Sequence, residues 1–195
     1  MKDLLTATAF CFALYVPNLA YGQAISLQPA SSQPSKGELS QGLSVKYAVI
    51  SSKVRTLEEA KTSLKKHGKR GLPIVGLAYE DTEEGEQVLT SELSEQVAAD
   101  ISGYIQFKSA GNYTLDFLAN DGLQIEIGGH EVGYYDGIHP CGYVGEIEVN
   151  IPSADYYPVH ATYFQRKGTA CLMMEWGPDC DGLELTTNDV FFHKP

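Results

Sequence analysis

The most constraining feature of the sequence is the stretch GYIQFKSAGNYTLDFLANDGLQIEIGG, which runs from Gly103 to Gly129. In YTLDFLA and in LQIEI, apolar and polar residues alternate, and this period of two is typical of a half-buried β-strand. Between them lies Asn120-Asp121-Gly122, whose residue types tolerate left-handed backbone angles and are predicted to turn two antiparallel strands back on each other. Gly128-Gly129 is predicted to reverse the chain again. The stretch therefore predicts a β-meander with a polar, acidic loop at one end.

Further segments of the same kind lie on both sides of this stretch. A capping box of Thr56 and Glu59 predicts a short amphipathic helix over 57–67, which ends before Gly68. The acidic segment 81–102 has no clear period and is predicted to be irregular, with one helical turn in SELSEQVAADI. Alternating strands are predicted in LSVKYAV, EIEVNI, YYPVHATYF, ACLMMEW and LELTTNDVFF. Many short strands and one helix near the start favour an antiparallel sandwich or barrel.

The N-terminal end of the chain has the pattern of a targeting segment. An apolar run follows Lys2 and ends at Ala20-Tyr21-Gly22, which predicts a signal peptide over 1–22, with a second plausible cleavage point after Ala24. An uncleaved membrane anchor is the alternative. Residues 23–42 are rich in Ser, Gln and Pro and are predicted to form a flexible leader outside the core. The folded domain is then predicted to span 43–195, with no stable membrane span after cleavage.

The net charge of the chain excludes one class of partner. The sequence carries a formal charge of -11 at pH 7. Phosphate backbones are bound by clustered Lys and Arg side chains, which release counterions. Nucleic acid is therefore not expected to bind.

The order of these features resembles the PA-fourteen domain family, the lectin-like β-sandwich named from anthrax protective antigen. The matching residues are, in chain order, Gly103-Tyr104, Asn120-Asp121-Gly122, Gly128-Gly129, Tyr157-Pro158, and Ala170, Leu172 and Trp176. The resemblance covers roughly 43–193 and implies an all-β, antiparallel β-sandwich with one short N-terminal helix. It also implies a secreted, periplasmic or cell-surface module that binds a glycan or polysaccharide and is not catalytic.

The same resemblance implies a calcium site. In sugar-binding members of the family, two adjacent Asp residues at the loop that corresponds to Asn120 and Asp121 bind Ca²⁺, and the ion binds sugar hydroxyls. Here the first position is Asn, which offers calcium an oxygen but no charge, so the affinity for calcium is expected to fall.

Counting chain reversals predicts which loops meet. If Asn120 to Gly122 turns at one end, the loop from Asp136 to Tyr143 and the turn at Arg166 to Gly168 lie at the same end. Loops that gather at one end of a rigid sheet are a common place for binding. The predicted ligand-binding residues are therefore Asn120, Asp121, Tyr135, Asp136, His139 and Arg166.

The same count sorts the cysteines. Of the four in the chain, Cys11 lies in the signal peptide, so Cys141, Cys171 and Cys180 remain. Cys141 and Cys171 fall at the same end as the loops above, and a disulfide needs Cα atoms within about 7 Å. A bridge between Cys141 and Cys171 is therefore predicted, which leaves Cys180 odd. The alternative is a bridge between Cys171 and Cys180, which are close in sequence.

Three functions of different classes are compatible with the sequence. The first is the glycan-binding module. The second is a structural or protein-interaction module of an envelope or extracellular assembly, favoured by the odd Cys180. The third is a glycoside hydrolase that uses Asp121 and Asp136 as a carboxylate pair, although the sequence contains no GxSxG or HExxH motif.

Overall fold

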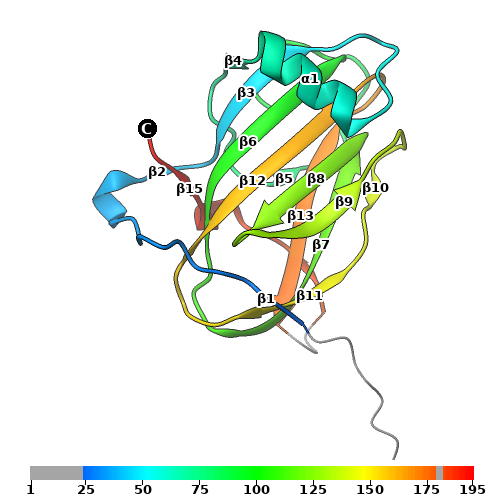
Figure 1. Ribbon diagram of the computed structural model, residues 1–195. Helices are drawn as coiled ribbons and strands as arrows, with labels where there is room; N and C mark the ends of the chain where they lie inside the picture. Colours follow the sequence, from blue (N-terminus) through cyan, green and yellow to red (C-terminus); the bar gives the residue numbers. More distant parts are fainter. Residues whose placement is uncertain (1–23, 179–181) are drawn as a thin grey trace, which may run out of the picture.

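Two β-sheets pack face to face and enclose the main core (Figure 1). The structure is a computed structural model that describes residues 24–178 and 182–195. The prediction of an all-β sandwich with one short helix is confirmed. The predicted signal peptide and Cys180 lie outside the described residues.

The first sheet, called sheet A, contains seven strands, with β1, β11, β7, β13 and β14 in spatial order; β10 also pairs with β7, and β5 with β13. Its pairs are antiparallel, except that β1 runs parallel to β11. Its strands are β1 (Ile25–Ser26), β5 (Ala78–Tyr79), β7 (Gly111–Asn120), β10 (Gly142–Tyr143), β11 (Ile147–Ile151), β13 (Cys171–Pro178) and β14 (Glu184–Leu185).

The second sheet, called sheet B, contains eight strands, with β2, β15, β6, β12, β8 and β9 in spatial order; β3 pairs with β6 and with β4. All of its pairs are antiparallel. Its strands are β2 (Ser40–Gln41), β3 (Ser44–Val49), β4 (Lys69–Arg70), β6 (Val97–Gln106), β8 (Gly122–Ile127), β9 (His130–Tyr135), β12 (Tyr156–Gln165) and β15 (Phe191–His193). Two short 3-10 helices, Lys36–Glu38 and Asn188–Val190, complete the secondary structure.

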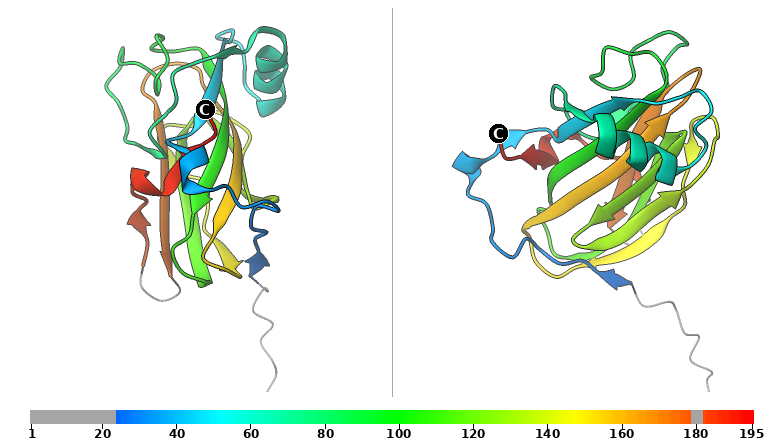
Figure 2. Two further views of the ribbon diagram at one scale, coloured as in Figure 1. Left: turned by 90° about the vertical axis from the view of Figure 1, so that its left-hand side faces the viewer. Right: turned by 45° about the horizontal axis from the view of Figure 1, so that its top comes forward.

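The one α-helix among the described residues, α1 (Leu57–His67), lies on the outer face of sheet B (Figures 1 and 2). The predicted capping box is present, because Thr56 accepts the N–H of Glu59 and the Glu59 side chain accepts the N–H of Thr56. Leu57 and Ala60 bury one face of the helix against Ala98 and Phe164 of the sheet. This second, small core holds α1 in place through its N-terminal half.

The prediction of a flexible leader is wrong for residues 24–42. Ile25 and Ser26 pair with β11, Leu27 is fully buried in the main core, and Gln33 donates from Nε2 to the carbonyl of Tyr156. The Ser- and Pro-rich composition predicted disorder, but one buried leucine and a series of backbone hydrogen bonds outweigh it. The folded domain therefore begins before residue 43.

The turn at Asn120 to Gly122 does not close a hairpin within one sheet, because β7 belongs to sheet A and β8 to sheet B. It crosses between the sheets, and the Asn120-Asp121 peptide bond is cis. Gly122 is needed for space, since a Cβ there would lie 2.2 Å from Cε1 of Phe164. The hairpin predicted at Gly128-Gly129 is confirmed: both have positive φ and join β8 to β9.

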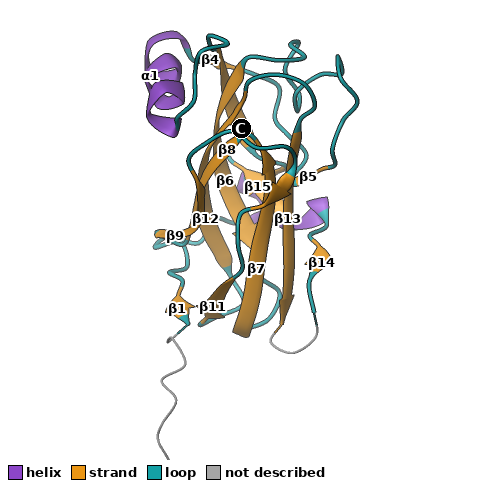
Figure 3. Ribbon diagram, turned by 90° about the vertical axis from the view of Figure 1, so that its right-hand side faces the viewer, coloured by secondary structure: helices purple, strands orange, loops and turns teal. Residues whose placement is uncertain are grey.

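The prediction that 81–102 is irregular is wrong at its end. The VAADI segment forms the first half of β6, a central strand of sheet B that pairs with β12 from Val97 to Gln106. Figure 3 shows this strand in the middle of the sandwich. Three consecutive buried residues, Val97, Ala98 and Ala99, hide the alternation because sheet B is covered on both faces there, by the core and by α1.

Candidate functional site

Three connecting segments meet at one end of the sandwich, as the count of chain reversals predicted. They are the crossing at 120–122, the loop 136–143 and the turn 166–169. We call this region the loop end.

Asp121 links these three segments. Its Oδ2 accepts the backbone N–H of Arg166 at 2.7 Å, and its backbone oxygen lies 2.9 Å from Nε2 of His139. The residue is only 2% exposed, and burial raises the pKa of its carboxyl, although the N–H of Arg166 acts in the opposite direction. Asp121 therefore serves as a buried acceptor that fixes the turn at Arg166.

Asn120 is held just as firmly. Its Nδ2 donates to Oγ1 of Thr169 at 3.1 Å, and its carbonyl accepts the hydroxyl of Tyr163 at 2.5 Å. Tyr163 is fully buried, and burial raises the pKa of its hydroxyl well above the ordinary value. The bond to Tyr163 connects β7 of sheet A to β12 of sheet B, and the bond to Thr169 connects β7 to the turn between β12 and β13.

Tyr135, Asp136 and His139 come from the end of β9 and the loop after it. The rings of Tyr135 and His139 stack with centroids 3.9 Å apart. Asp136 has another role, because its Oδ1 accepts the N–H of Leu57 at 2.6 Å. It caps the start of α1 across 79 residues of sequence, so the loop end and the helix are joined.

Arg166 is the partly buried cation of the loop end, next to the exposed Lys167. Its Nη1 donates to the carbonyl of Ser52 at 3.4 Å, while its buried Nε has no hydrogen-bond partner among the described residues. A buried N–H donor without a partner costs free energy, and such groups are rare in folded proteins. The residue as a whole is partly exposed.

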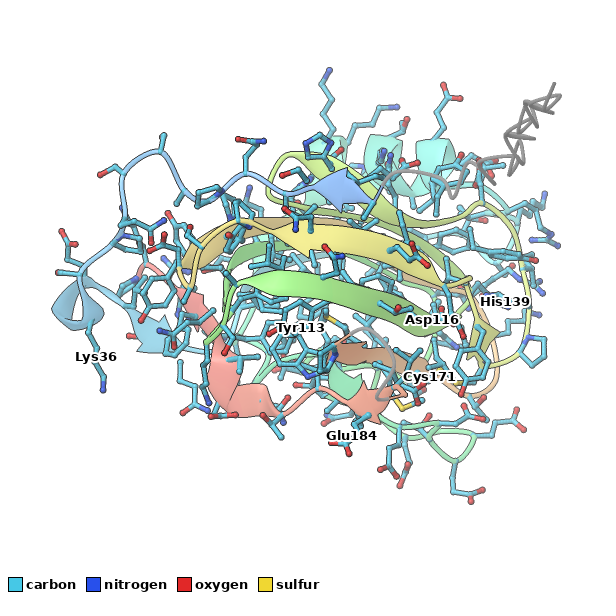
Figure 4. The ribbon with its side chains drawn as sticks, turned by 90° about the horizontal axis from the view of Figure 1, so that it is seen from below. Lys36, Tyr113, Asp116, His139, Cys171 and Glu184 are labelled. Carbon is cyan, nitrogen blue, oxygen red and sulfur yellow. A yellow bond between two sulfur atoms is a disulfide. The ribbon has the colours of Figure 1, made fainter. Side chains whose placement is uncertain are left out.

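The predicted disulfide is confirmed. Cys141 and Cys171 are bonded, with Cα atoms 5.8 Å apart, and Figure 4 shows His139 and Cys171 on the same side of the molecule. The bond fastens the loop that carries His139 to the start of β13. Asp81 lies close enough to both sulfurs to form a three-residue group of potential metal ligands, but sulfurs joined in a disulfide are not thiolate ligands.

Asn120 and Asp121 do not make a good calcium site. Calcium takes about six to eight oxygen ligands. The pair offers a single carboxylate, one oxygen of which already accepts the N–H of Arg166, and the charge of Arg166 acts on that carboxylate. Both residues are at most 5% exposed. We therefore derive no calcium-dependent step, and calcium binding stays a prediction.

The structure thus joins Asp121, Arg166, His139 and Tyr135 directly, places Asn120 beside them, and assigns Asp136 to the helix. Sequence reasoning missed Thr169 and Tyr163, the partners of Asn120. Tyr163 alternates in a strand as a core residue would, and no local pattern marks its hydroxyl. Two further tyrosines, Tyr134 in β9 and Tyr143 in β10, are 51% and 61% exposed.

The fold and the loop end define a class: a two-sheet antiparallel β-sandwich domain whose loops gather at one end. The family model of the PA14 domain matches residues 84–188, more than half of the chain, and the chain therefore belongs to the PA14 domain family. The resemblance inferred from the sequence is confirmed. No curated protein matches the sequence.

Solved structures show the same fold. The PA14 domain of the MpAFP antifreeze protein has a TM-score of 0.67 at 15% identity, covering 83% of this chain and 94% of that one. The PA14 sugar-binding domain from an RTX adhesin has a TM-score of 0.61 at 17% identity, with 78% and 98% covered. The A domain of epithelial adhesin 9 from Candida glabrata, in complex with Galβ1-3GlcNAc, has 0.65 at 18%, with 88% and 96% covered. At these identities the likeness concerns the fold.

Proposed function

We propose that this domain is a secreted, non-catalytic glycan-binding module that holds its ligand at the loop end. The observation that carries the proposal is the Arg166 side chain, a guanidinium with five N–H donors on a residue that is partly exposed. Arg166 lies in a turn that Asp121 fixes, and Asp121 also contacts His139. A fixed donor of this kind suits a sugar hydroxyl, because the fold already holds the side chain in place and binding then loses little further conformational entropy.

Two further observations support the proposal. Two of the similar structures are named as a sugar-binding domain and as a complex with a disaccharide. The disulfide between Cys141 and Cys171 fits an oxidising, extracellular compartment. Among the described residues, no helix is both long and apolar enough to cross a membrane.

A non-catalytic role is favoured by how the two candidate carboxylates are used. Asp121 accepts the N–H of Arg166, and Asp136 accepts the N–H of Leu57. Both therefore have structural partners, and we expect no turnover of glycosides.

The test is the affinity of the oxidised protein for a panel of glycans that includes Galβ1-3GlcNAc, measured by calorimetry for wild type and for Arg166→Ala. Hydrogen bonds to charged groups contribute about 1.5–3 kcal/mol, so Arg166→Ala is expected to weaken binding at least about tenfold. The matched control is Lys167→Ala, which removes the neighbouring exposed cation and is expected to have no effect. Binding is expected to survive a chelator, because the proposed contact needs no calcium.

Equal binding by Arg166→Ala and wild type would move the site elsewhere. If no glycan binds but a protein partner is retained on the immobilised domain, the protein-interaction function replaces this one.

A further inference from the structure

A second candidate site lies away from the loop end, between α1 and the outer face of sheet B. There a groove of about 570 Å³ is lined by residues of α1, β3, β6 and β12. Figure 2 shows α1 lying over this face of the sheet. The lining includes Lys46, Lys61, Lys65, Asp100 and His160, and we call it the basic groove.

The basic groove continues into a neighbouring one. Lys46 and Asp100 line both, and the second groove, of about 230 Å³, adds Arg70 and Lys194. Together the two grooves hold five of the fourteen lysines and arginines of the chain and one carboxylate side chain, that of Asp100. The protein as a whole has a net charge of -11 and repels anions. A concentration of cations in one place creates a positive local potential that attracts them.

The cations outnumber the carboxylates that act on them, which are Asp100, Glu126 near His160 and Glu38 near Lys194. Lys46 and Arg70 lie directly opposite each other on β3 and β4, and like charges in this position destabilise a sheet. Asp100, the one carboxylate side chain in the lining, is shared between Lys46 at 3.5 Å and His160 at 2.8 Å. The helix dipole accounts for Lys65 near the end of α1, but it does not account for Lys46 or Arg70 on the strands.

We propose that the basic groove and its continuation bind an anionic polysaccharide, whose carboxylate or sulfate groups lie against Lys46, Arg70 and the lysines of α1. The planar guanidinium of Arg70 matches a carboxylate or sulfate through two parallel hydrogen bonds, and the lysines act as point charges. A linear polyanion can follow both grooves, because they adjoin each other and share Lys46 and Asp100. This site is independent of the glycan site proposed at the loop end.

The test compares the binding of the full chain to heparin, to polygalacturonate and to neutral dextran in low and high salt. We expect both polyanions to bind, dextran not to bind at this site, and binding to weaken as ionic strength rises, because exposed charges are screened. Lys46→Glu/Arg70→Glu is expected to lower the affinity for polygalacturonate at least about tenfold. The matched control, Lys36→Glu/Lys53→Glu, makes the same change in net charge at exposed lysines outside the grooves and is expected to reduce binding much less.

A milder variant guards against misfolding. Lys46→Gln/Arg70→Gln removes the opposed charges, so it is expected to unfold at the same temperature as wild type or higher while still losing polyanion binding. Arg166→Ala is expected to keep polyanion binding, and this result separates the present proposal from the one at the loop end.

The proposal is overturned if the groove and control variants bind polygalacturonate equally. It is also overturned if neither polyanion binds while phosphatidylserine vesicles or duplex DNA do.

Discussion

At the scale of single residues, Asp121 shows how a polar side chain can be structural at the place where a ligand is expected. It is 2% exposed, and its carboxylate takes up the N–H of Arg166. Without that acceptor, the N–H would be buried without a partner, which costs more than an average hydrogen bond contributes. The same contact fixes the backbone at Arg166, and the Arg166 side chain itself donates from Nη1 to the carbonyl of Ser52.

Two substitutions of Asp121 distinguish its role as a hydrogen-bond acceptor from any effect of its negative charge. Asp121→Ala is expected to lower the free energy of unfolding by about 1–3 kcal/mol. Asp121→Asn keeps an acceptor oxygen and removes a carboxyl whose pKa burial raises, so it is expected to be close to wild type. Urea unfolding at neutral pH measures both. Equal destabilisation by Ala and Asn would show that the charge matters and the acceptor does not.

At the scale of elements, the pair β6 and β12 forms the centre of sheet B and carries an exposed ion pair on its outer face. Nε2 of His160 lies 2.8 Å from Oδ1 of Asp100. The hydrogen bond to Asp100 raises the pKa of His160, and the same bond lowers the pKa of Asp100. Glu126 and Lys61 also face His160, with opposite effects on its pKa.

This pair makes the stability of the sheet depend on pH. The contribution of His160 is fully present below about pH 6.5 and is lost as pH rises through its raised pKa. That of Asp100 is present above about pH 3.8 and is lost as pH falls through its lowered pKa. His160→Gln is therefore expected to unfold at a lower temperature than wild type near pH 5 and at a similar temperature above about pH 8. A difference that does not change with pH would contradict the assignment.

At the scale of the whole molecule, the disulfide between Cys141 and Cys171 closes a loop of 30 residues. It joins the loop end to the start of β13. The segment that contains β10, β11 and β12 is therefore tied together at both of its ends. A cross-link of this kind stabilises a fold mainly by restricting the unfolded chain.

Reduction should therefore destabilise the domain as a unit. Cys141→Ser/Cys171→Ser is expected to lower the free energy of unfolding by about 3 kcal/mol, measured by urea unfolding with and without reductant. The double variant is the control, because reductant is expected to change wild type alone. If wild type unfolds at the same urea concentration in both conditions, this bond does not stabilise the fold.

The sequence by itself determined the elements whose signals are local. The capping box of Thr56 and Glu59 set the start of α1, and the alternation in LQIEI and the two glycines after it set the hairpin of β8 and β9. The order of turns was enough to bring Asp121, His139 and Arg166 to one end and to pair Cys141 with Cys171, because each antiparallel strand reverses the chain once.

Only the tertiary structure decided which strands pair in each sheet and which distant residues contact each other. Which sheet a strand joins depends on contacts far apart in sequence, so the crossing at Asn120 to Gly122 looked like a hairpin. The burial of Leu27 and the capping of α1 by Asp136 depend in the same way on residues that fold back from a distance. Local patterns record which face of a strand is apolar, but not what covers it. The contacts of Arg166 and the residues that line the basic groove were therefore visible only in the structure.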